Sequence, residues 1–429
     1  MSSYKTLPTP GDTAWFTHDR FGMFIHFGLY AMPARHEWVK NYEEIPEDHY
    51  DLYFKHFNPD LYDPKEWARQ AKAAGMKYVV MTTKHHEGFC LFDSKYTDYK
   101  STNTLCGKDL IREYVDAFRA EGLHIGFYYS LIDWHHPDFT IDVNHPRRDD
   151  PDAKQQNEGR DMHRYAEYMR NQVRELLTND IKKYAQYMRD QVTELLTNYG
   201  KIDILWFDFS YSQNNGTGDK AWQKGKGKDD WEAEKLIATA RALQPHIIID
   251  NRTEIDQDLW TPEQYEPDQW VRDKKTGELV TWEACHTFSG SWGYFRDEQT
   301  WKSPEMLIRL LVNTVSRGGN LLMNVGPTSR GYLDYRAEEA LKVYADWMKY
   351  NSRSIYGCTM AEPEFKEPRD CRLTQSEDGK RLYLHLFAYP FGYLRVPGLG
   401  GKVEYAQFLH DGSEVRFTDG TDCFFLTDD

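Results

Sequence analysis

The sequence predicts an α/β protein: a (β/α)8-like TIM barrel over residues 1–357, followed by a small C-terminal antiparallel β-sandwich domain over residues 358–429. Two observations support this fold class. Short apolar runs alternate with amphipathic stretches through most of the chain, which is the pattern of βα units around a parallel sheet. After Cys358 the pattern changes to short segments of alternating polarity separated by turn residues, such as 381–387 and 402–409, which is typical of antiparallel strands.

The expected barrel strands are apolar runs that end at a polar residue or a turn. Seven are predicted, over residues 21–30, 78–86, 124–130, 202–208, 246–251, 281–289 and 319–326. The run Ile202–Phe207 is almost unbroken, as in a strand that is buried on both faces, and it ends at Asp208. The eighth strand cannot be placed from the sequence.

Amphipathic helices are expected between these strands, over residues 64–75, 109–120, 160–198, 231–243 and 304–316, with a last helix over 335–350. Residues 165–179 recur almost unchanged as residues 184–198. A single duplication is not a solenoid, which needs about three repeats. We therefore interpret it as a tandem duplication of one barrel helix. We expect the copy nearer Asp208 to pack on the barrel and the other to project or to lengthen the helix.

Composition limits the partners of the protein. No apolar window approaches the length of a membrane span, and the first residues lack the apolar core of a signal peptide. The six cysteines include no C-x-x-C pair, so we expect them to be reduced and the protein to be cytoplasmic. The formal net charge of −15 argues against nucleic acid and anionic membranes as partners. Self-association into a homo-oligomer is left open.

Polar and aromatic residues gather where the expected strands end. They are His26, Glu37, Trp38, His85, His86, Tyr128, Tyr129, Trp134, Asp208 and Arg252, followed by the acidic loop 261–268. Because the C-terminal ends of barrel strands meet at one face, these side chains predict an active site there. Aromatic residues make up 15% of the chain, and aromatic faces pack well on sugar rings.

Several catalytic motifs are missing from the sequence, and their absence reduces the number of reaction classes that it supports. Adjacent histidines on a strand point to opposite faces, so His85 and His86 alone are not expected to chelate one metal. The sequence contains no H-E-x-x-H helix, no glycine-rich phosphate loop and no G-x-S-x-G elbow. Two carboxylates from different strands in an aromatic, histidine-rich pocket remain, and they suit glycoside hydrolysis without a metal or another cofactor.

Several motifs in order along the chain resemble the α-L-fucosidases of glycoside hydrolase family 29. The matching segments are 21–28, Glu37-Trp38, 84–89, 127–130, 205–208, 291–294 and 318–327. The resemblance implies a retaining exo-α-L-fucosidase with a catalytic barrel and a C-terminal β-sandwich, acting on a fucosylated oligosaccharide or glycoconjugate. Two other function classes are kept: a fucose-binding homologue that has lost turnover, and a metal-dependent hydrolase on the same barrel.

The resemblance also implies roles for single residues. Asp208 matches the nucleophile of the family. Glu263 is the expected acid/base, with Glu266 and Glu283 as rivals, and we expect that acid to be buried beside Asp208. The residues expected to contact or surround the sugar are His26, Glu37, Trp38, His85, His86, Tyr129, Trp206, Arg252 and Trp292. Trp292 matches an aromatic residue that contacts the C5 methyl group of fucose.

Overall fold

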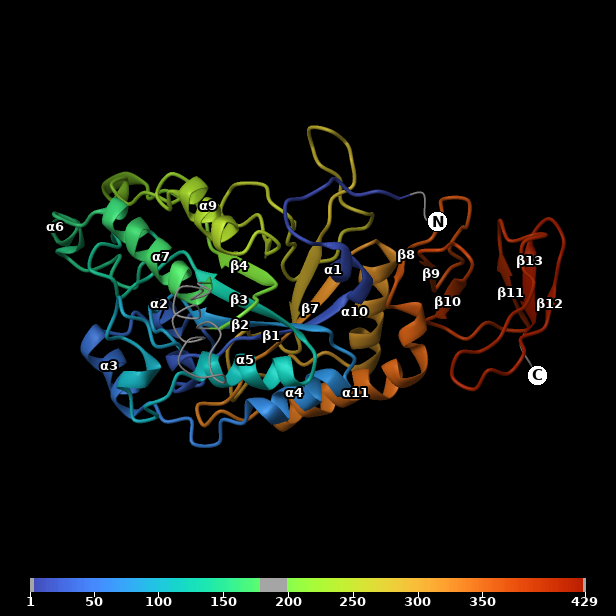
Figure 1. The fold of residues 1–429 in the computed structure, drawn as a ribbon, viewed down its shortest axis with the longest axis horizontal. Helices are drawn as coiled ribbons and strands as arrows, with labels where there is room; N and C mark the ends of the chain where they lie inside the picture. Colours follow the sequence, from blue (N-terminus) through green and yellow to red (C-terminus); the bar gives the residue numbers. More distant parts are fainter. Residues whose placement is uncertain (1–3, 178–198, 427–429) are drawn as a thin grey trace, which may run out of the picture.

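The computed structural model describes residues 4–177 and 199–426, and its centre is a curled sheet of seven parallel strands (Figure 1). The strands lie in the order β5-β4-β3-β2-β1-β7-β6. They are β1 (Phe21–Ile25), β2 (Tyr78–Lys84), β3 (His124–Ser130), β4 (Ile204–Asp208), β5 (Ile248–Ile249), β6 (Glu283–Thr287) and β7 (Asn320–Val325). Each of the seven predicted strands is therefore confirmed, although most are shorter than the apolar run that predicted them.

Helices cover the convex face of this sheet. The longer ones are α3 (Glu47–His56), α4 (Pro64–Ala73), α5 (Leu110–Ala120), α7 (Met162–Leu177), α9 (Ala233–Leu243), α10 (Pro304–Ser316) and α11 (Tyr335–Asn351). Short helices are α1 (Ala14–Asp19), α2 (Val39–Tyr42) and α6 (Ala153–Gln156). Four helices begin at a side chain that accepts a hydrogen bond from the first turn, namely Asp63, Asp109, Ser303 and Asp334. None of the helices in the described ranges has the length and apolar character of a membrane span.

Alternation along the strands divides the core into two parts. Met23, Val79, Phe127 and Leu205 face the helices, in the larger core cluster. Their strand neighbours Phe24, Val80, Tyr128 and Trp206 face the concave side, where they form a second cluster. Because side chains alternate along a strand, the register of β3 against β4 fixes which residues reach the concave side.

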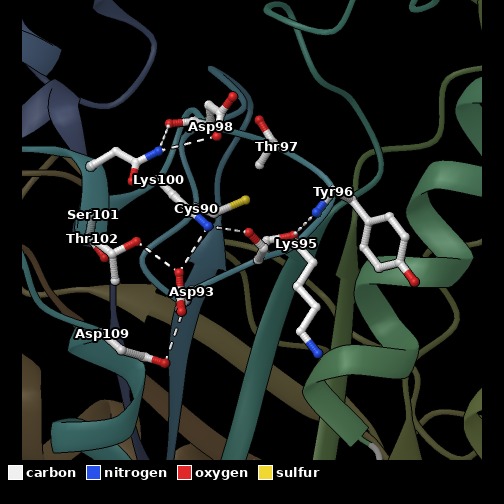
Figure 2. A network of polar contacts seen from close by, with 12 residues as sticks. Cys90, Asp93, Lys95, Tyr96, Thr97, Asp98, Lys100, Ser101, Thr102 and Asp109 are labelled. Carbon is white, nitrogen blue, oxygen red and sulfur yellow. Dashed lines mark hydrogen bonds and ion pairs between the residues drawn. The ribbon is translucent and has the colours of Figure 1, made fainter.

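The connection between β2 and α5 folds back onto the end of β2. Cys90 forms a bridge with Lys84, and a polar network then holds the following loop (Figure 2). In this network Asp93 pairs with Lys100 at 2.9 Å and accepts a hydrogen bond from Thr102 at 2.9 Å. The turn that follows β2 is therefore fixed between the strand and this loop.

The segment 258–264 lies between the two edge strands of the sheet. Leu259 forms a parallel bridge with Asp250, directly after β5, and Glu263 forms one with Cys285 in β6. Asp258 anchors the start of the segment. Its side chain is buried, accepts hydrogen bonds from the backbone N–H groups of Gly11 and Ile249 at 2.7 Å each, and pairs with Arg241.

The first copy of the duplicated segment lies in α7. Tyr165, Met169, Gln172 and Leu176 are buried on the inner face of this helix, and Gln172 accepts a hydrogen bond from Tyr129 of β3. The expectation that this copy projects is wrong, because its apolar face is needed to cover the sheet. The second copy, residues 184–198, lies outside the described residues.

Two small antiparallel sheets follow α11, at the end of the molecule drawn in orange and red (Figure 1). One has the order β10-β9-β8, with β8 (Cys358–Met360), β9 (Cys371–Ser376) and β10 (Leu382–Leu386). The other has the order β11-β13-β12, with β11 (Tyr393–Val396), β12 (Phe417–Thr418) and β13 (Cys423–Leu426). The antiparallel character expected after Cys358 is confirmed. The predicted strand over 402–409 is wrong, because that segment has only the single bridge from Gln407 to Glu414.

The buried anchor of segment 258–264 gives a stability prediction. Replacing Asp258 with Ala removes the carboxylate that pairs with Arg241 and accepts from two backbone N–H groups, and breaking a buried pair typically costs about 3–5 kcal/mol. We expect the free energy of unfolding, measured by urea titration, to fall by that amount. The exposed Asp256→Ala change is the control and should have little effect. Equal stability of the two variants would contradict the anchoring role of Asp258.

Candidate active site

Asp208 lies at the C-terminal end of β4, surrounded by hydrogen-bond donors. Its Oδ2 accepts a hydrogen bond from the Tyr128 hydroxyl at 2.7 Å, and its Oδ1 accepts one from Arg252 Nη1 at 2.9 Å. His86 Nε2 lies 3.8 Å from Oδ2. Burial raises the pKa of Asp208 to about 6, and nearby Glu263 adds to this, while Arg252 and Tyr128 act in the opposite direction. The carboxylate is thus poorly solvated but oriented on both oxygens.

Arg252 joins Asp208 to a second carboxylate. The same Nη1 atom lies 2.7 Å from Glu263 Oε2. The separation of the two contacting oxygens cannot exceed the two contact distances combined. That limit is close to the roughly 5–5.5 Å of retaining glycosidases and short of the roughly 6.5–9.5 Å of inverting ones. Glu263 is nevertheless not buried, since 42% of its side chain is exposed, so the expectation of a buried acid is wrong for this residue.

The guanidinium of Arg252 is itself held in place. Nε donates to Thr261 Oγ1 at 3.0 Å, and the group lies over the Trp206 ring at 4.3 Å from its centroid. Trp206 is buried beneath it and stacks on Tyr128, with the ring centroids 5.7 Å apart. Trp206 therefore forms the floor of the site.

The two rival glutamates lie elsewhere. Glu266 accepts hydrogen bonds from α10, through Thr314 Oγ1 at 3.2 Å and Asn313 Nδ2 at 3.5 Å. Glu283 is the first residue of β6, at the opposite end of the strands from Asp208. It is buried there and accepts a hydrogen bond from the Tyr78 hydroxyl at 2.6 Å. Neither contacts Arg252 in the way that Glu263 does.

Three predicted histidines gather beside Asp208. His85 and His86 follow the end of β2 and lie in a turn, and their ring centroids are only 4.0 Å apart. The argument that they point to opposite faces is wrong, because the strand has already ended. His86 Nδ1 lies 2.8 Å from Ser130 Oγ, and His26 Nδ1 lies 2.6 Å from Asn324 Oδ1.

Burial lowers the pKa of all three rings, to about 3 for His85 and well below the ordinary value for His26 and His86. They are neutral near pH 7, so each ring can offer one donor and one acceptor. In the described ranges no group of three or more His, Cys, Asp or Glu side chains is arranged to hold a metal ion.

Glu37, Trp38 and Trp292 form the rim of the pocket. Glu37 Oε2 accepts a hydrogen bond from the backbone N–H of Gly293 at 2.8 Å, which ties the segment after β6 to the segment after β1. Trp292 packs on His26, with centroids 5.3 Å apart, and Trp38 packs on His86 at 5.0 Å. Apolar faces and histidine rings therefore lie together on the side of the sheet that carries Asp208.

The expectation that Tyr129 lies in the pocket wall is wrong. Its hydroxyl donates to Gln172 in α7 at 2.7 Å, and Lys84 Nζ lies over its ring on the convex side of the sheet. The preceding residue, Tyr128, occupies the concave side and binds Asp208. The correction follows from strand alternation, since the register pairs Tyr128 with Trp206 and Ser130 with Asp208.

A profile described as Alpha-L-fucosidase matches residues 5–353 of this sequence. The chain belongs to the α-L-fucosidase family. The resemblance seen in its motifs is confirmed, and hydrolysis of α-L-fucosides with retention is the activity of this family. Its members are glycoside hydrolases.

This chain is also similar to individual α-L-fucosidases along most of its length. Isoenzyme 1 from Paenibacillus thiaminolyticus is 44% identical, with a TM-score of 0.85 over 97% of this chain and 94% of that chain. A Bacteroides thetaiotaomicron enzyme trapped as a covalent intermediate with 2-fluoro-fucosyl fluoride is 26% identical, with a TM-score of 0.76 over 98% of this chain and 96% of that chain. The plasma α-L-fucosidase of Homo sapiens is 29% identical over 82% of this chain and 71% of that protein.

Sequence reasoning missed two residues of this candidate site, Asn324 and Phe209, and it named Tyr128 only among the residues at the strand ends, without a role. Tyr128 holds Asp208, and Asn324 contacts His26 and also donates to the backbone oxygen of Trp292 at 2.6 Å. Phe209 follows Asp208 with a φ of 80°, which is strained for a residue with a side chain, and its ring packs on Trp38. Only the strand register shows that Tyr128, and not Tyr129, lies on the face that carries Asp208.

Neighbouring tyrosines allow a matched test of the site. We expect Tyr128→Phe to lower kcat/KM about 10- to 100-fold, since a hydrogen bond to a carboxylate is lost. The acidic limb of the pH profile should also change. In the parent, kcat/KM should fall as pH drops through about 6 if the reaction needs Asp208 in its ionised form, since Asp208 gains a proton there. Without the Tyr128 hydroxyl that limb should move to higher pH. Tyr129→Phe should leave kcat/KM and the limb unchanged, and equal profiles for both variants would refute the assignment of Tyr128.

Proposed function

We propose that this chain is a retaining exo-α-L-fucosidase in which Asp208 is the nucleophile and Glu263 the general acid/base. The observation that carries the proposal is the shared contact of both carboxylates with Arg252 Nη1. A retaining mechanism needs a carboxylate on each side of the anomeric carbon at short separation. A fucose-binding homologue would have no need for this linked pair. No specific observation favours the metal-dependent alternative.

In the first step Asp208 attacks the anomeric carbon and the bond to the leaving oxygen breaks. Glu263 gives its proton to that oxygen, and a fucosyl ester on Asp208 results. Tyr128 and Arg252 hold the attacking carboxylate in line, and the positive charge of Arg252 moderates the negative charge that moves between the two groups.

In the second step Glu263, now ionised, takes a proton from water. The water oxygen bonds to the anomeric carbon while the ester bond to Asp208 breaks. Two inversions give net retention, and both carboxyl groups return to their initial protonation states. The 42% exposure of the Glu263 side chain suits this role, since the leaving group departs and water enters from that side.

The sugar pocket supports a 6-deoxy hexose. His26, His85 and His86 present neutral nitrogens for hydroxyl groups, while Trp292 offers an apolar face where the C5 methyl of fucose would pack. The substrate is a terminal fucose on an oligosaccharide or glycoconjugate.

The net charge of −15 supports neither nucleic acid nor an anionic membrane as a partner, and the six free cysteines support a reducing compartment such as the cytoplasm.

We also infer that segment 258–264 takes the place of the eighth strand and closes a (β/α)8 barrel. Its parallel bridges reach one edge strand on each side, as a missing strand would. This arrangement delivers Glu263 to the face that carries Asp208. The start of β8 at Cys358 supports a boundary between a barrel domain, 1–357, and a C-terminal β-sandwich domain, 358–429.

The nucleophile is tested by removing it. Asp208→Gly should release the aryl group from an aryl α-L-fucoside roughly 10³-fold or more slowly, which is the scale of nucleophile loss in other hydrolases. Added azide should restore release and give a fucosyl azide of inverted, β configuration, because a small anion fits the space left by the carboxylate. An Asp208→Gly variant as active as the parent would overturn the mechanism.

The acid/base is tested against its nearest rival. Glu263→Ala should lower kcat about 10²–10⁴-fold for a glycan with a poor leaving group and much less for an activated aryl fucoside, since only the former needs a proton from the enzyme. Glu266→Ala is the matched control and should leave both rates within about twofold. A Glu266→Ala variant with the leaving-group dependence described for Glu263→Ala would transfer the role to Glu266.

A further inference from the structure

Glu87 is a buried acid behind the sugar pocket that the mechanism above does not use. It lies in the turn after β2, where Gly88 has a φ of 84° and its N–H bonds back to the His85 oxygen at 3.0 Å. A side chain at Gly88 would collide with Asp133, so only glycine fits the turn. The turn places the Glu87 side chain beneath His85, and 1% of the residue is exposed.

One carboxyl oxygen of Glu87 lies within hydrogen-bond distance of the imidazole of His85. Oε2 lies 3.2 Å from His85 Nδ1, and the two side chains are buried together. His85 Nε2 has no hydrogen-bond partner among the residues that the structure describes. Nε2 is therefore the nitrogen left for a ligand. The His85 ring stacks on Tyr128, with centroids 5.6 Å apart, and Tyr128 binds Asp208.

Burial disfavours the ionised form of Glu87 and Asp133 adds to this, while the backbone N–H groups of Glu87 and Leu29 and the charge of Lys40 act in the opposite direction on its pKa. The titratable groups that act on it or feel its charge are His85, Tyr30, Tyr50, Tyr99, Lys40 and Asp133. Lys40 is the cation of this set, and its Nζ pairs with Glu47 at 3.0 Å. The other oxygen of Glu87, Oε1, is buried without a hydrogen-bond partner. Burial raises the pKa of Glu87 to about 8, and burial lowers that of His85 to about 3.

We propose that Glu87 is a positioning residue that sets the tautomer of His85. As a neutral carboxylic acid it donates a hydrogen bond to Nδ1, so the imidazole carries its own proton on Nε2 and presents an N–H donor to a hydroxyl oxygen of the sugar. The partner of one ring nitrogen decides the state of the other, as for histidines that bind metals. This inference rests on the proposed function, because it takes the His85 pocket as the fucose site.

A pH dependence follows from this arrangement. When Glu87 loses its proton, the carboxylate can only accept, so the imidazole proton moves to Nδ1 and Nε2 becomes an acceptor. The raised pKa of Glu87 means that the donor form of His85 is present below about pH 8 and is lost above it. A sugar hydroxyl that accepts from Nε2 must then reverse and donate to it, and so gives up any other acceptor that its proton had. KM should therefore rise on the alkaline side, with a smaller change in kcat.

The tautomer can be read directly in the free protein. We would label the histidines with 15N, assign the His85 signals from their loss in His85→Gln, and record one-bond and long-range 1H–15N spectra from pH 6 to 9. The expected result is a protonated Nε2 at pH 6 to 7 that exchanges toward a protonated Nδ1 above about pH 8. A protonated Nδ1 throughout this range would overturn the proposal. The measurement needs no turnover, so it separates this inference from the proposed function.

Two substitutions extend the test to catalysis. Glu87→Gln should keep the Nε2–H form, because its amide can donate to Nδ1 at every pH, and should remove the alkaline rise in KM. Glu87→Leu should leave both tautomers populated and raise KM roughly tenfold, the scale of one lost hydrogen bond. Glu283→Gln is a matched buried control and should leave the His85 signals unchanged. If Glu87→Leu does not fold, the titration of the wild-type protein and the Glu87→Gln variant still test the proposal. An alkaline rise that persists in Glu87→Gln would refute the proposal.

Discussion

The guanidinium of Arg252 holds two carboxyl groups close to each other, one buried and one partly exposed. One nitrogen contacts Asp208 and Glu263, while the flat face of the group lies on Trp206 and Nε is fixed by Thr261. A planar cation can do this where an ammonium cannot, because it stacks and donates in several directions at once. The short separation of the two acids follows from this single contact, and the proposed double displacement depends on that separation.

The path of the chain between β5 and β6 makes this contact possible. Arg252 follows β5 closely, and Glu263 lies at the end of the segment that runs along both edge strands. The buried Asp258 fixes the start of that segment through the backbone of β5 and through Arg241. An irregular segment can therefore position an acid/base as firmly as a regular strand would, since its own backbone is paired on both sides.

The duplicated segment keeps unchanged the residues that are buried in its first copy. The two copies differ where α7 leaves side chains exposed or half-exposed, at Glu167, Asn171 and Arg174. The residues of the first copy that are buried, such as Tyr165, Gln172 and Leu176, recur unchanged in the second. Gln172 alone binds Tyr129, Cys90 and Ser94, so a change at this position would leave several buried polar groups without partners.

The sequence by itself determined the seven parallel strands, because a strand buried on both faces must be apolar along its length and must stop where polar side chains begin. It also predicted that Asp208, Arg252 and the histidines lie close together, since polar groups at the ends of several parallel strands meet at one face of the sheet. These signals are local, so they survive without knowledge of the fold.

Only the tertiary structure decided the rest. Tyr128 rather than Tyr129 binds Asp208 because the register of β3 against β4 selects one face, and a one-residue shift would exchange them. His85 and His86 meet because β2 ends one residue before them. Glu263 rather than Glu266 or Glu283 reaches Arg252 because bridges to both edge strands guide the chain there. Register, strand ends and non-local pairing arise from contacts between distant segments, which no local pattern contains.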